Sequence, residues 1–266
     1  MVVFPNAKIN LGLDILSKRE DGYHNISSCF YPIPFCDILE ILPAEKLSFA
    51  STGISIPGRD SDNLCLKAYD LLKEDFKIPS VQIYLHKIIP IGAGLGGGSA
   101  DASFALKCLN DLFELNIEAS QLEHYASQIG SDCPFFIENK PVIAEGTGNV
   151  FSPVQIDLKG KYLVLLYPDV HIGTAEAYSG VVPSAPERDV KSIIESGVKN
   201  WPDQLKNDFE KSIFPKYFAI SDLKGQLVDS GANYASMTGS GSAVFGLFNK
   251  KPDVDFDYVV WEGILG

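Results

Sequence analysis

Residues 90–102 have the sequence Pro90-Ile91-Gly92-Ala93-Gly94-Leu95-Gly96-Gly97-Gly98-Ser99-Ala100-Asp101-Ala102, with five glycines among seven consecutive positions. Glycine adopts positive φ without strain, and it lets backbone N–H groups approach a ligand with no Cβ in between. Successive N–H groups at the start of a helix form a site for anions, which the helix dipole reinforces. The stretch therefore predicts a loop that binds a polyphosphate.

The segments on either side predict that this loop is ordered. Before it, Val81, Ile83 and Leu85 alternate with polar residues, which indicates a half-buried strand. After it, apolar residues recur at helical spacing, which predicts an amphipathic helix; they are Ala102, Ala105, Leu106, Leu109, Leu112 and Phe113. Glycine-rich stretches are often flexible turns, but a strand and a helix at the two ends favour an ordered phosphate-binding loop.

Two common glycine-rich loops do not match this pattern. The spacing Gly92-x-Gly94-x-x-Gly97 fits a dinucleotide-binding fingerprint, but the strand before it should then be continuously apolar, and no second strand leads to an acidic residue. A Walker A loop requires a lysine before its final Ser or Thr, and Gly98-Ser99-Ala100 has none. The loop belongs to neither class.

Periodicity predicts further elements along the chain. Along the first strand, Ile9 and Leu11 are expected to be buried, while Lys8 and Asn10 lie on an exposed face. We place a domain boundary near residue 152, which divides the chain into 1–152 and 153–266. The predicted strands are Ala7–Leu13, Tyr23–Pro32, Asp37–Leu42, Val81–His86, Lys161–Tyr167 and Ala243–Phe248, and the predicted helices are Asn63–Phe76, Ser120–Ile129 (with Ser120 as N-cap) and Asp222–Asp229.

Composition excludes several classes of protein. The chain has 266 residues, 45% of them hydrophobic, and a formal net charge of −12, which disfavours nucleic acids and anionic membranes as partners. Its five cysteines include no C-x-x-C pair, which indicates reduced thiols and neither a disulfide framework nor a zinc site. The longest apolar run is Tyr162–Tyr167, and the N-terminus does not resemble a signal peptide. We expect a cytoplasmic protein.

Three stretches together resemble the motifs of the GHMP kinases, the family of galactokinase, homoserine kinase and mevalonate kinase. They are the glycine-rich stretch, Pro5-Asn6-Ala7-Lys8-Ile9-Asn10-Leu11-Gly12-Leu13, and Met237-Thr238-Gly239-Ser240-Gly241-Ser242-Ala243-Val244-Phe245. The resemblance implies ATP-dependent phosphorylation of an alcohol, with Mg²⁺ bound to the nucleotide. It also implies an α+β fold in two domains, the first like a small-subunit ribosomal protein and the second ferredoxin-like, with the active site in the cleft between them.

Two further segments resemble one branch of that family, whose substrate is a cytidine diphosphate-linked alcohol of the non-mevalonate isoprenoid pathway. They are Arg19-Glu20-Asp21-Gly22-Tyr23-His24 and Ile129-Gly130-Ser131-Asp132-Cys133-Pro134-Phe135-Phe136. The alternatives are a kinase of the family that acts on another small alcohol, a nucleotide-binding regulator without catalysis, and a dinucleotide-binding oxidoreductase. The protein is expected to be a monomer or a homodimer.

The resemblance also implies roles for individual residues. Asp132 is expected to be the general base and Lys8 the catalytic cation, although a loop aspartate is otherwise typical of a helix cap and a surface lysine is typically solvated. No ligand of the metal is assigned. The ATP phosphates are expected at Pro90, Gly92, Ala93, Gly94, Leu95, Gly96, Gly97, Gly98 and Ser99, and the alcohol substrate at Asn10, Tyr23, His24, Thr174, Tyr178, Gly239 and Ser240.

Within the substrate group, Tyr23 is expected to stack on the cytosine and His24 to contact the edge of the base. Tyr178 is the candidate for the second face of the base, with Thr174 nearby. Ordinary packing in the core is an equally good interpretation of Tyr178.

Overall fold

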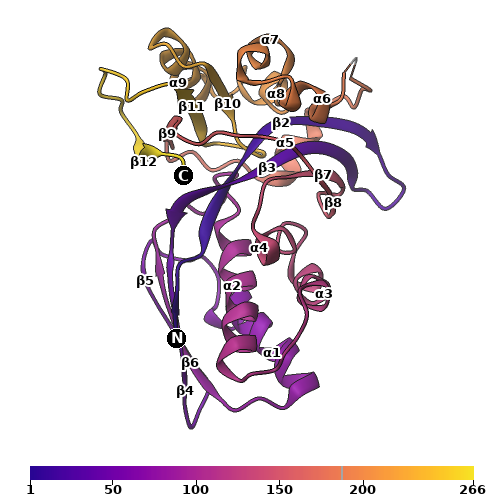
Figure 1. The fold of residues 1–266 in the computed structure, drawn as a ribbon, viewed down its shortest axis with the longest axis vertical. Coiled ribbons are helices and arrows are strands. Elements are labelled where there is room, and N and C mark those ends of the chain that lie inside the picture. The colour runs from indigo at the N-terminus through magenta and orange to yellow at the C-terminus, as the bar shows by residue number, and fades with distance from the viewer. Residues whose placement is uncertain (187) are drawn as a thin grey trace. The chain divides into compact units, whose positions relative to one another are not determined.

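The computed structural model describes residues 1–186 and 188–266 (Figure 1). The helices are α1 Leu64–Phe76, α2 Gly97–Leu112, α3 Ala119–Ile129, α4 Phe135–Glu138, α5 Thr174–Ser179, α6 Val190–Glu195, α7 Trp201–Gln204, α8 Glu210–Ile213 and α9 Phe218–Asp229, with short 3-10 turns at Asp60–Asp62 and Val198–Asn200. The strands are β1 Val2–Val3, β2 Asn6–Lys18, β3 His24–Cys36, β4 Ile38–Pro43, β5 Ser48–Gly53, β6 Val81–Lys87, β7 Val142–Gly146, β8 Val150–Pro153, β9 Tyr162–Leu166, β10 Tyr234–Met237, β11 Val244–Phe248 and β12 Val259–Ile264.

The chain forms two compact units, and neither is a single stretch of sequence. The first consists of Met1–Ala7, Pro34–Ile91 and Gly96–Lys140. The second consists of Lys8–Ile33, Gly92–Leu95 and Pro141–Gly266. The glycine-rich loop is therefore shared: its first four residues belong to the second unit, and the rest belong to the first. A boundary near residue 152 stays a prediction.

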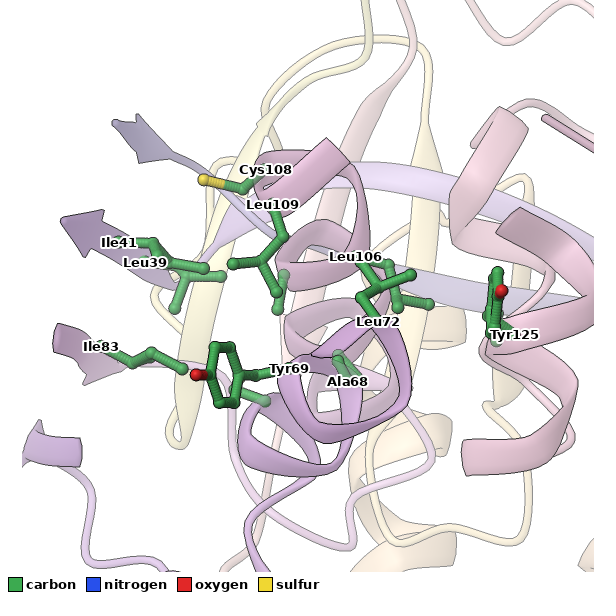
Figure 2. Packing of buried hydrophobic residues seen from close by; sticks show 14 of the residues in the cluster. Leu39, Ile41, Ala68, Tyr69, Leu72, Ile83, Leu106, Cys108, Leu109 and Tyr125 are labelled. Atoms are coloured by element: carbon green, nitrogen blue, oxygen red, sulfur yellow. The ribbon is translucent and has the colours of Figure 1, made fainter. Parts of the chain in front are cut away.

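The first unit is a four-stranded sheet, in the order β1-β4-β6-β5, packed against helices. Strand β4 pairs antiparallel with β6, with Leu39 opposite Leu85, whereas β5 pairs parallel with β6. In Figure 2, Leu39, Ile41 and Ile83 point from the sheet toward helix side chains such as Tyr69. Residues from both layers form one core. Its burial holds α1 and α2 against the sheet, because removing apolar surface from water is the dominant favourable term in folding.

Helix α1 illustrates how local signals define an element. Its N-cap is Asn63, whose side chain accepts a hydrogen bond from the backbone N–H of Cys65 at 2.9 Å. It ends at Lys77, which adopts a left-handed conformation with φ 51°. The prediction of a helix from Asn63 to Phe76 is confirmed, with Asn63 as its cap.

The second unit contains two further sheets, β10-β11-β9-β12 and β2-β3-β7-β8. The pairs β10–β11, β11–β9 and β12–β9 are all antiparallel. Helix α9 contributes Ile220, Leu223 and Leu227 to a core that also includes Val164 of β9 and Val244 of β11. Helices and largely antiparallel sheets in both units confirm the α+β class.

Strand β2 does not have the exposed face predicted for it. Lys8 and Asn10 are 3% and 2% exposed, as buried as the apolar residues between them. Within the second unit, the backbone N–H of Lys8 donates to Leu95 O at 2.9 Å and that of Asn10 to Thr238 Oγ1 at 3.0 Å. Loops remote in sequence therefore cover the face that alternation assigned to solvent.

Helix boundaries differ from the sequence prediction at several points. Helix α3 begins at Ala119 with Glu118 as N-cap, so Ser120 is not the cap. Its first turn closes on the carbonyl of Glu118, which accepts from Gln121 and Leu122, and this places Ser120 inside the helix. Helix α9 begins at Phe218, four residues before the predicted start. Strands β1, β5, β7, β8, β10 and β12 are additions that periodicity did not reveal.

Among the described residues, no helix is long and apolar enough to cross a membrane.

Candidate active site

The first half of the glycine-rich loop, residues 92–95, is fixed by its carbonyl groups. Gly92 and Gly94 have positive φ, whereas the side chains of Ala93 and Leu95, which alternate with them, are buried. The carbonyl of Leu95 accepts from Lys8 N–H, and that of Gly94 accepts from Thr238 Oγ1 at 3.1 Å. The carbonyls of Gly94 and Leu95 therefore point toward other residues of the second unit. The amide N–H groups of this backbone face the other way.

The second half of the loop is the start of helix α2. Gly96 is the N-cap, with φ 71°, and no side chain of the described residues caps the helix there. The first turn closes with Ala100 N–H donating to Gly96 O at 2.9 Å. The amides of Gly97, Gly98 and Ser99 precede that bond, and the first amides of a helix have no partner within the helix. Such amides, reinforced by the helix dipole, are a common arrangement for binding anions.

The protein itself requires glycine at two of these positions. A Cβ at Gly94, where φ is +80°, would lie 2.0 Å from Thr238 O, and one at Gly97 would lie 2.9 Å from Lys87 Nζ. At Gly98 φ is ordinary, and a Cβ would meet only Leu64 Cδ1 at 3.8 Å. The fold therefore does not explain the glycine at position 98. The space beside Gly98 is open, and a glycine at such a position allows a ligand to approach the backbone closely.

Lys8 lies inside the second unit on strand β2. Its ammonium donates to Asn10 Oδ1 at 2.5 Å and lies 4.7 Å from the centroid of the Phe30 ring. Asn10 is held in turn by Ser28, whose Oγ accepts from Asn10 Nδ2 at 2.9 Å. The sequence interpretation of a solvated lysine is therefore wrong: Lys8 is a buried cation with a defined orientation. A buried cation of this kind interacts strongly with nearby negative charge, because the surrounding dielectric is low.

Asp132 lies in the first unit, in the turn between α3 and α4. The N-cap of α4 is Pro134, so the alternative role of Asp132 as the residue that caps this helix is not supported. The turn is tied to α2 by Ser103, whose Oγ lies 2.6 Å from Cys133 O and 2.9 Å from Ser99 O. Ser103 thus joins the backbone of Cys133, the residue after Asp132, to Ser99 in the first turn of α2.

Ser103 was not predicted as a site residue, although it and Asp101 are the polar residues among small apolar ones on the described buried side of α2. Burial raises the pKa of the neighbouring Cys133 thiol to about 11, which keeps it protonated and unreactive. Asp132 and Lys8 belong to different units, and their pairing in catalysis stays a prediction.

The residues expected to contact the nucleobase lie in the second unit. The rings of His24 and Tyr178 stack with their centroids 4.7 Å apart and their planes 20° apart. Burial, and to a smaller extent Lys18, lowers the pKa of His24, so the imidazole is neutral near neutral pH. A neutral imidazole offers one donor and one acceptor to the edge of a base. Tyr23 is 63% exposed, which leaves its ring accessible to a ligand.

Both interpretations of Tyr178 describe some of its contacts. It packs edge-on against Phe209, with centroids 4.9 Å apart, as a residue at the margin of the second core. Its contact with His24 also brings it beside a residue expected to bind substrate. Thr174 begins the same short helix, α5, and is exposed.

Gly239 and Ser240 lie in the loop between β10 and β11, which packs on the glycine-rich loop. A Cβ at Gly239 would lie 3.0 Å from Gly94 Cα. Asn207 supports this loop, with its side-chain amide donating to Met237 O at 2.8 Å and to Gly239 O at 2.9 Å. Neither Asn207 nor the bridging Thr238 was predicted as a site residue. Thr238 lies inside the motif at residues 237–245, whereas nothing in the sequence near Asn207 indicates the role of that residue.

The comparisons with known proteins agree with this arrangement. Residues 63–140 match the family described as "GHMP kinases N terminal domain", and residues 181–262 match "GHMP kinases C terminal". A protein of Cytophaga hutchinsonii named 4-diphosphocytidyl-2-C-methyl-D-erythritol kinase is 54% identical over 254 residues, covering 95% of this chain and 94% of its own. The protein of the same name from Parabacteroides distasonis is 52% identical over 270 residues, with both chains fully covered.

Solved structures show the same relationship. The crystal structure of a 4-(cytidine 5'-diphospho)-2C-methyl-D-erythritol kinase superposes with a TM-score of 0.80 at 31% identity, covering 93% of this chain and 90% of that one. The mevalonate kinase of Methanococcus jannaschii gives a TM-score of 0.68 at 15% identity over 94% and 90% of the two chains, a likeness of fold alone. By its sequence and by its fold, this chain belongs to the GHMP kinase family.

Proposed function

We propose that the protein transfers the γ-phosphoryl group of ATP to the 2-hydroxyl of 4-diphosphocytidyl-2-C-methyl-D-erythritol, in the non-mevalonate route to isoprenoid precursors. The observation that supports this most strongly is the full-length identity of 52% and 54% to two kinases of that name. The match to the second of these kinases extends over the whole chain, so the aligned residues include the segments around Tyr23 and Asp132 and the glycine-rich loop. A cytoplasmic location, with ATP and the alcohol as its partners, is part of the proposal.

The glycine-rich loop is the proposed site for the ATP phosphates. The amides of Gly97, Gly98 and Ser99 and the dipole of α2 supply partial positive charge, which a protein of net charge −12 must provide locally. Pro90 and the loop's first half, residues 92–95, are proposed to supply the remaining backbone. The tight packing of Gly94 on Thr238 restrains the first half of the loop before the nucleotide arrives. A rigid site loses less conformational entropy on binding.

Catalysis is assigned to Asp132 and Lys8. Asp132 accepts the proton of the substrate hydroxyl as its oxygen attacks the γ-phosphorus and ADP leaves. Lys8, held by Asn10, offsets the negative charge that is shared between the attacking oxygen and the phosphoryl group. Enzymes of this chemistry act mainly by positioning and electrostatics, so an oriented buried cation suits the task.

Recognition of the cytidine end is assigned to Tyr23, His24 and Tyr178, with Thr174, Gly239 and Ser240 completing the substrate site. An exposed aromatic ring stacks on the face of any base. A neutral imidazole, in contrast, distinguishes hydrogen-bond donors from acceptors on the edge of the base. The stacking of Tyr178 on His24 fixes the plane of that imidazole. Selection for cytosine over other bases therefore falls to His24.

Mg²⁺ is proposed to accompany the nucleotide. Magnesium is usually bound through substrate phosphates and one or two carboxylates and keeps several waters. Among the described residues, no group of three His, Cys, Asp or Glu side chains is placed to hold an ion, so no protein ligand is assigned. When bound, the ion would neutralise phosphate charge.

The test is phosphotransfer with the purified protein. The protein is incubated with ATP, Mg²⁺ and the cytidyl-diphospho alcohol, and mass spectrometry identifies the product. We expect one added phosphoryl group on the methylerythritol moiety and competition by CDP. Turnover of simple polyols with no inhibition by CDP or CTP would contradict the proposal and favour a GHMP kinase for another alcohol.

A further inference from the structure

A buried ionic cluster lies directly beneath the start of helix α2. The ammonium of Lys87, at the end of β6, contacts Asp37 Oδ2 and lies 2.9 Å from Asp101 Oδ2. The three side chains are 3%, 0% and 4% exposed. They come from β6, from the connection between β3 and β4, and from α2, so only the fold of the first unit brings them together.

Asp37 is fully engaged in this cluster. Besides Lys87, it accepts hydrogen bonds from the backbone N–H groups of Ile88 and Ile89, at 2.5 and 2.9 Å. These two residues begin the segment that leads into the glycine-rich loop. Asp37 therefore fixes the entry to the loop, and two backbone donors with an ammonium satisfy its carboxylate.

Asp101 is not fully engaged. One of its oxygens contacts Lys87, but Oδ1 is buried and has no hydrogen-bond partner among the described residues. Asp101 follows Gly97 by four residues, which is roughly 6 Å along the helix axis. At Gly97 a Cβ would lie 2.9 Å from Lys87 Nζ, so the cluster touches the backbone of the loop itself.

From this geometry we infer that Asp101 is a positioning residue whose charge state sets how tightly the glycine-rich loop binds the phosphates of the nucleotide. The inference rests on the proposed function, because it takes the loop as the phosphate site. With Asp101 ionised, two carboxylates face one ammonium, and the net charge beneath an anion-binding turn is −1. With Asp101 protonated, the cluster is neutral, because one carboxylate and one ammonium balance each other.

The electrostatic surroundings place this change near neutral pH. Burial, reinforced by the Asp37 carboxylate and opposed by Lys87, raises the pKa of Asp101 to about 7. Burial disfavours the charged form of Lys87, but Asp101 and Asp37 outweigh it and raise the pKa of this ammonium. Among the described residues, Cys65 on α1 also faces the cluster, and burial raises the pKa of its thiol. Asp101 is therefore the group that changes charge between about pH 6 and pH 8.

The direction of the effect follows from linkage. A bound polyphosphate disfavours a nearby carboxylate, so nucleotide binding is coupled to proton uptake by Asp101. The dissociation constant should rise with pH through about 7, by about fivefold between pH 6 and pH 8, the order expected for partly screened charges at this separation. A cluster that served stability alone would not produce this dependence.

The experiment measures binding of the Mg²⁺ complex of a non-hydrolysable ATP analogue by calorimetry from pH 6 to pH 8. The variant is Asp101→Asn, which keeps an oxygen for Lys87 and removes the charge. We expect it to bind independently of pH and about fivefold more tightly than the unmodified protein at pH 8, with equal affinity at pH 6. The matched control is Asp111→Asn on an exposed turn near the other end of α2, which should retain the full pH dependence.

Proton uptake by the unmodified protein gives a second measurement that requires no variant. It is obtained by repeating the titration near pH 7 in two buffers of different ionisation enthalpy. Uptake absent from the unmodified protein, an unchanged pH profile in Asp101→Asn, or weaker binding by this variant at every pH would overturn the inference. Failure of the unmodified protein to bind the analogue at any pH would instead refute the proposed function.

Discussion

Replacing Gly98 with alanine should change protein stability and nucleotide affinity in opposite directions. Gly98 is the second residue of α2, is exposed, and has an ordinary helical conformation. A Cβ there would make one van der Waals contact, with Leu64 Cδ1 at 3.8 Å. Alanine is thus compatible with the structure, and Gly98→Ala should stabilise the free protein.

The size of each effect can be estimated from the structure. Alanine is favoured over glycine inside a helix by about 1 kcal/mol, and the first turn retains roughly half of that preference. The expected gain is about 0.5 kcal/mol, or about 1–2 °C in Tm for a chain of this size. If the phosphates of ATP lie against this turn, the new methyl group occupies their space, and affinity should fall about tenfold or more.

The assay measures Tm without ligand and the dissociation constant of an ATP analogue for the same preparations. The matched control is Gly225→Ala in α9, where a Cβ would meet nothing within 4 Å. Because Gly225 lies inside its helix, this variant should raise Tm by at least as much and leave nucleotide binding unchanged. Unaltered affinity in Gly98→Ala, with Tm raised as expected, would refute the placement of the phosphates on this turn.

The remaining predictions concern residues with distinct roles. Gly94→Ala should lower Tm and nucleotide affinity together, because its Cβ would lie 2.0 Å from a backbone oxygen. Thermal unfolding and calorimetry measure the two effects. An unchanged Tm would contradict the close packing of Gly94 on Thr238. Asp132→Asn should reduce kcat by about 100-fold or more in steady-state assays while ATP binding persists, and near-normal turnover would exclude the general-base role. Tyr23→Ala should mainly raise KM for the cytidyl substrate, since stacking contributes uniform binding, and a defect confined to kcat would argue against it. Lys87→Met should lower the free energy of unfolding, measured in urea, by about 3–5 kcal/mol, because it leaves two buried carboxylates without their cation. A loss under about 1 kcal/mol would show that the cluster is unimportant for stability.

Local patterns predict much of the secondary structure and the phosphate loop. Asn63 lies at the start of a helix as the sequence indicates, and the predicted strand before the glycine-rich loop ends within one residue of the observed one. These features depend on side-chain period and on the backbone freedom of glycine, both of which act over a few residues. The family resemblance adds the kinase assignment, which the comparisons confirm.

Strand β2 shows where local patterns fail. Alternation correctly identifies Ile9 and Leu11 as buried, but it cannot state what covers the opposite face. Lys8 and Asn10 are buried because Leu95 and Thr238, which lie far along the chain, bond to their backbone. The prediction of Ser120 as a cap is wrong for a local reason: the first turn closes on the carbonyl of Glu118, so Ser120 lies inside the helix.

By itself, the sequence determined that a strand, a run of glycines and a helix follow one another, because those preferences are local to each residue. Only the tertiary structure decided that Lys8 is buried, that Ser103 supports the turn next to Asp132, and that Lys87 joins Asp37 and Asp101 beneath the loop. The physical reason is that burial and charge pairing depend on which remote segments meet, and chain entropy opposes each such meeting until the whole core forms.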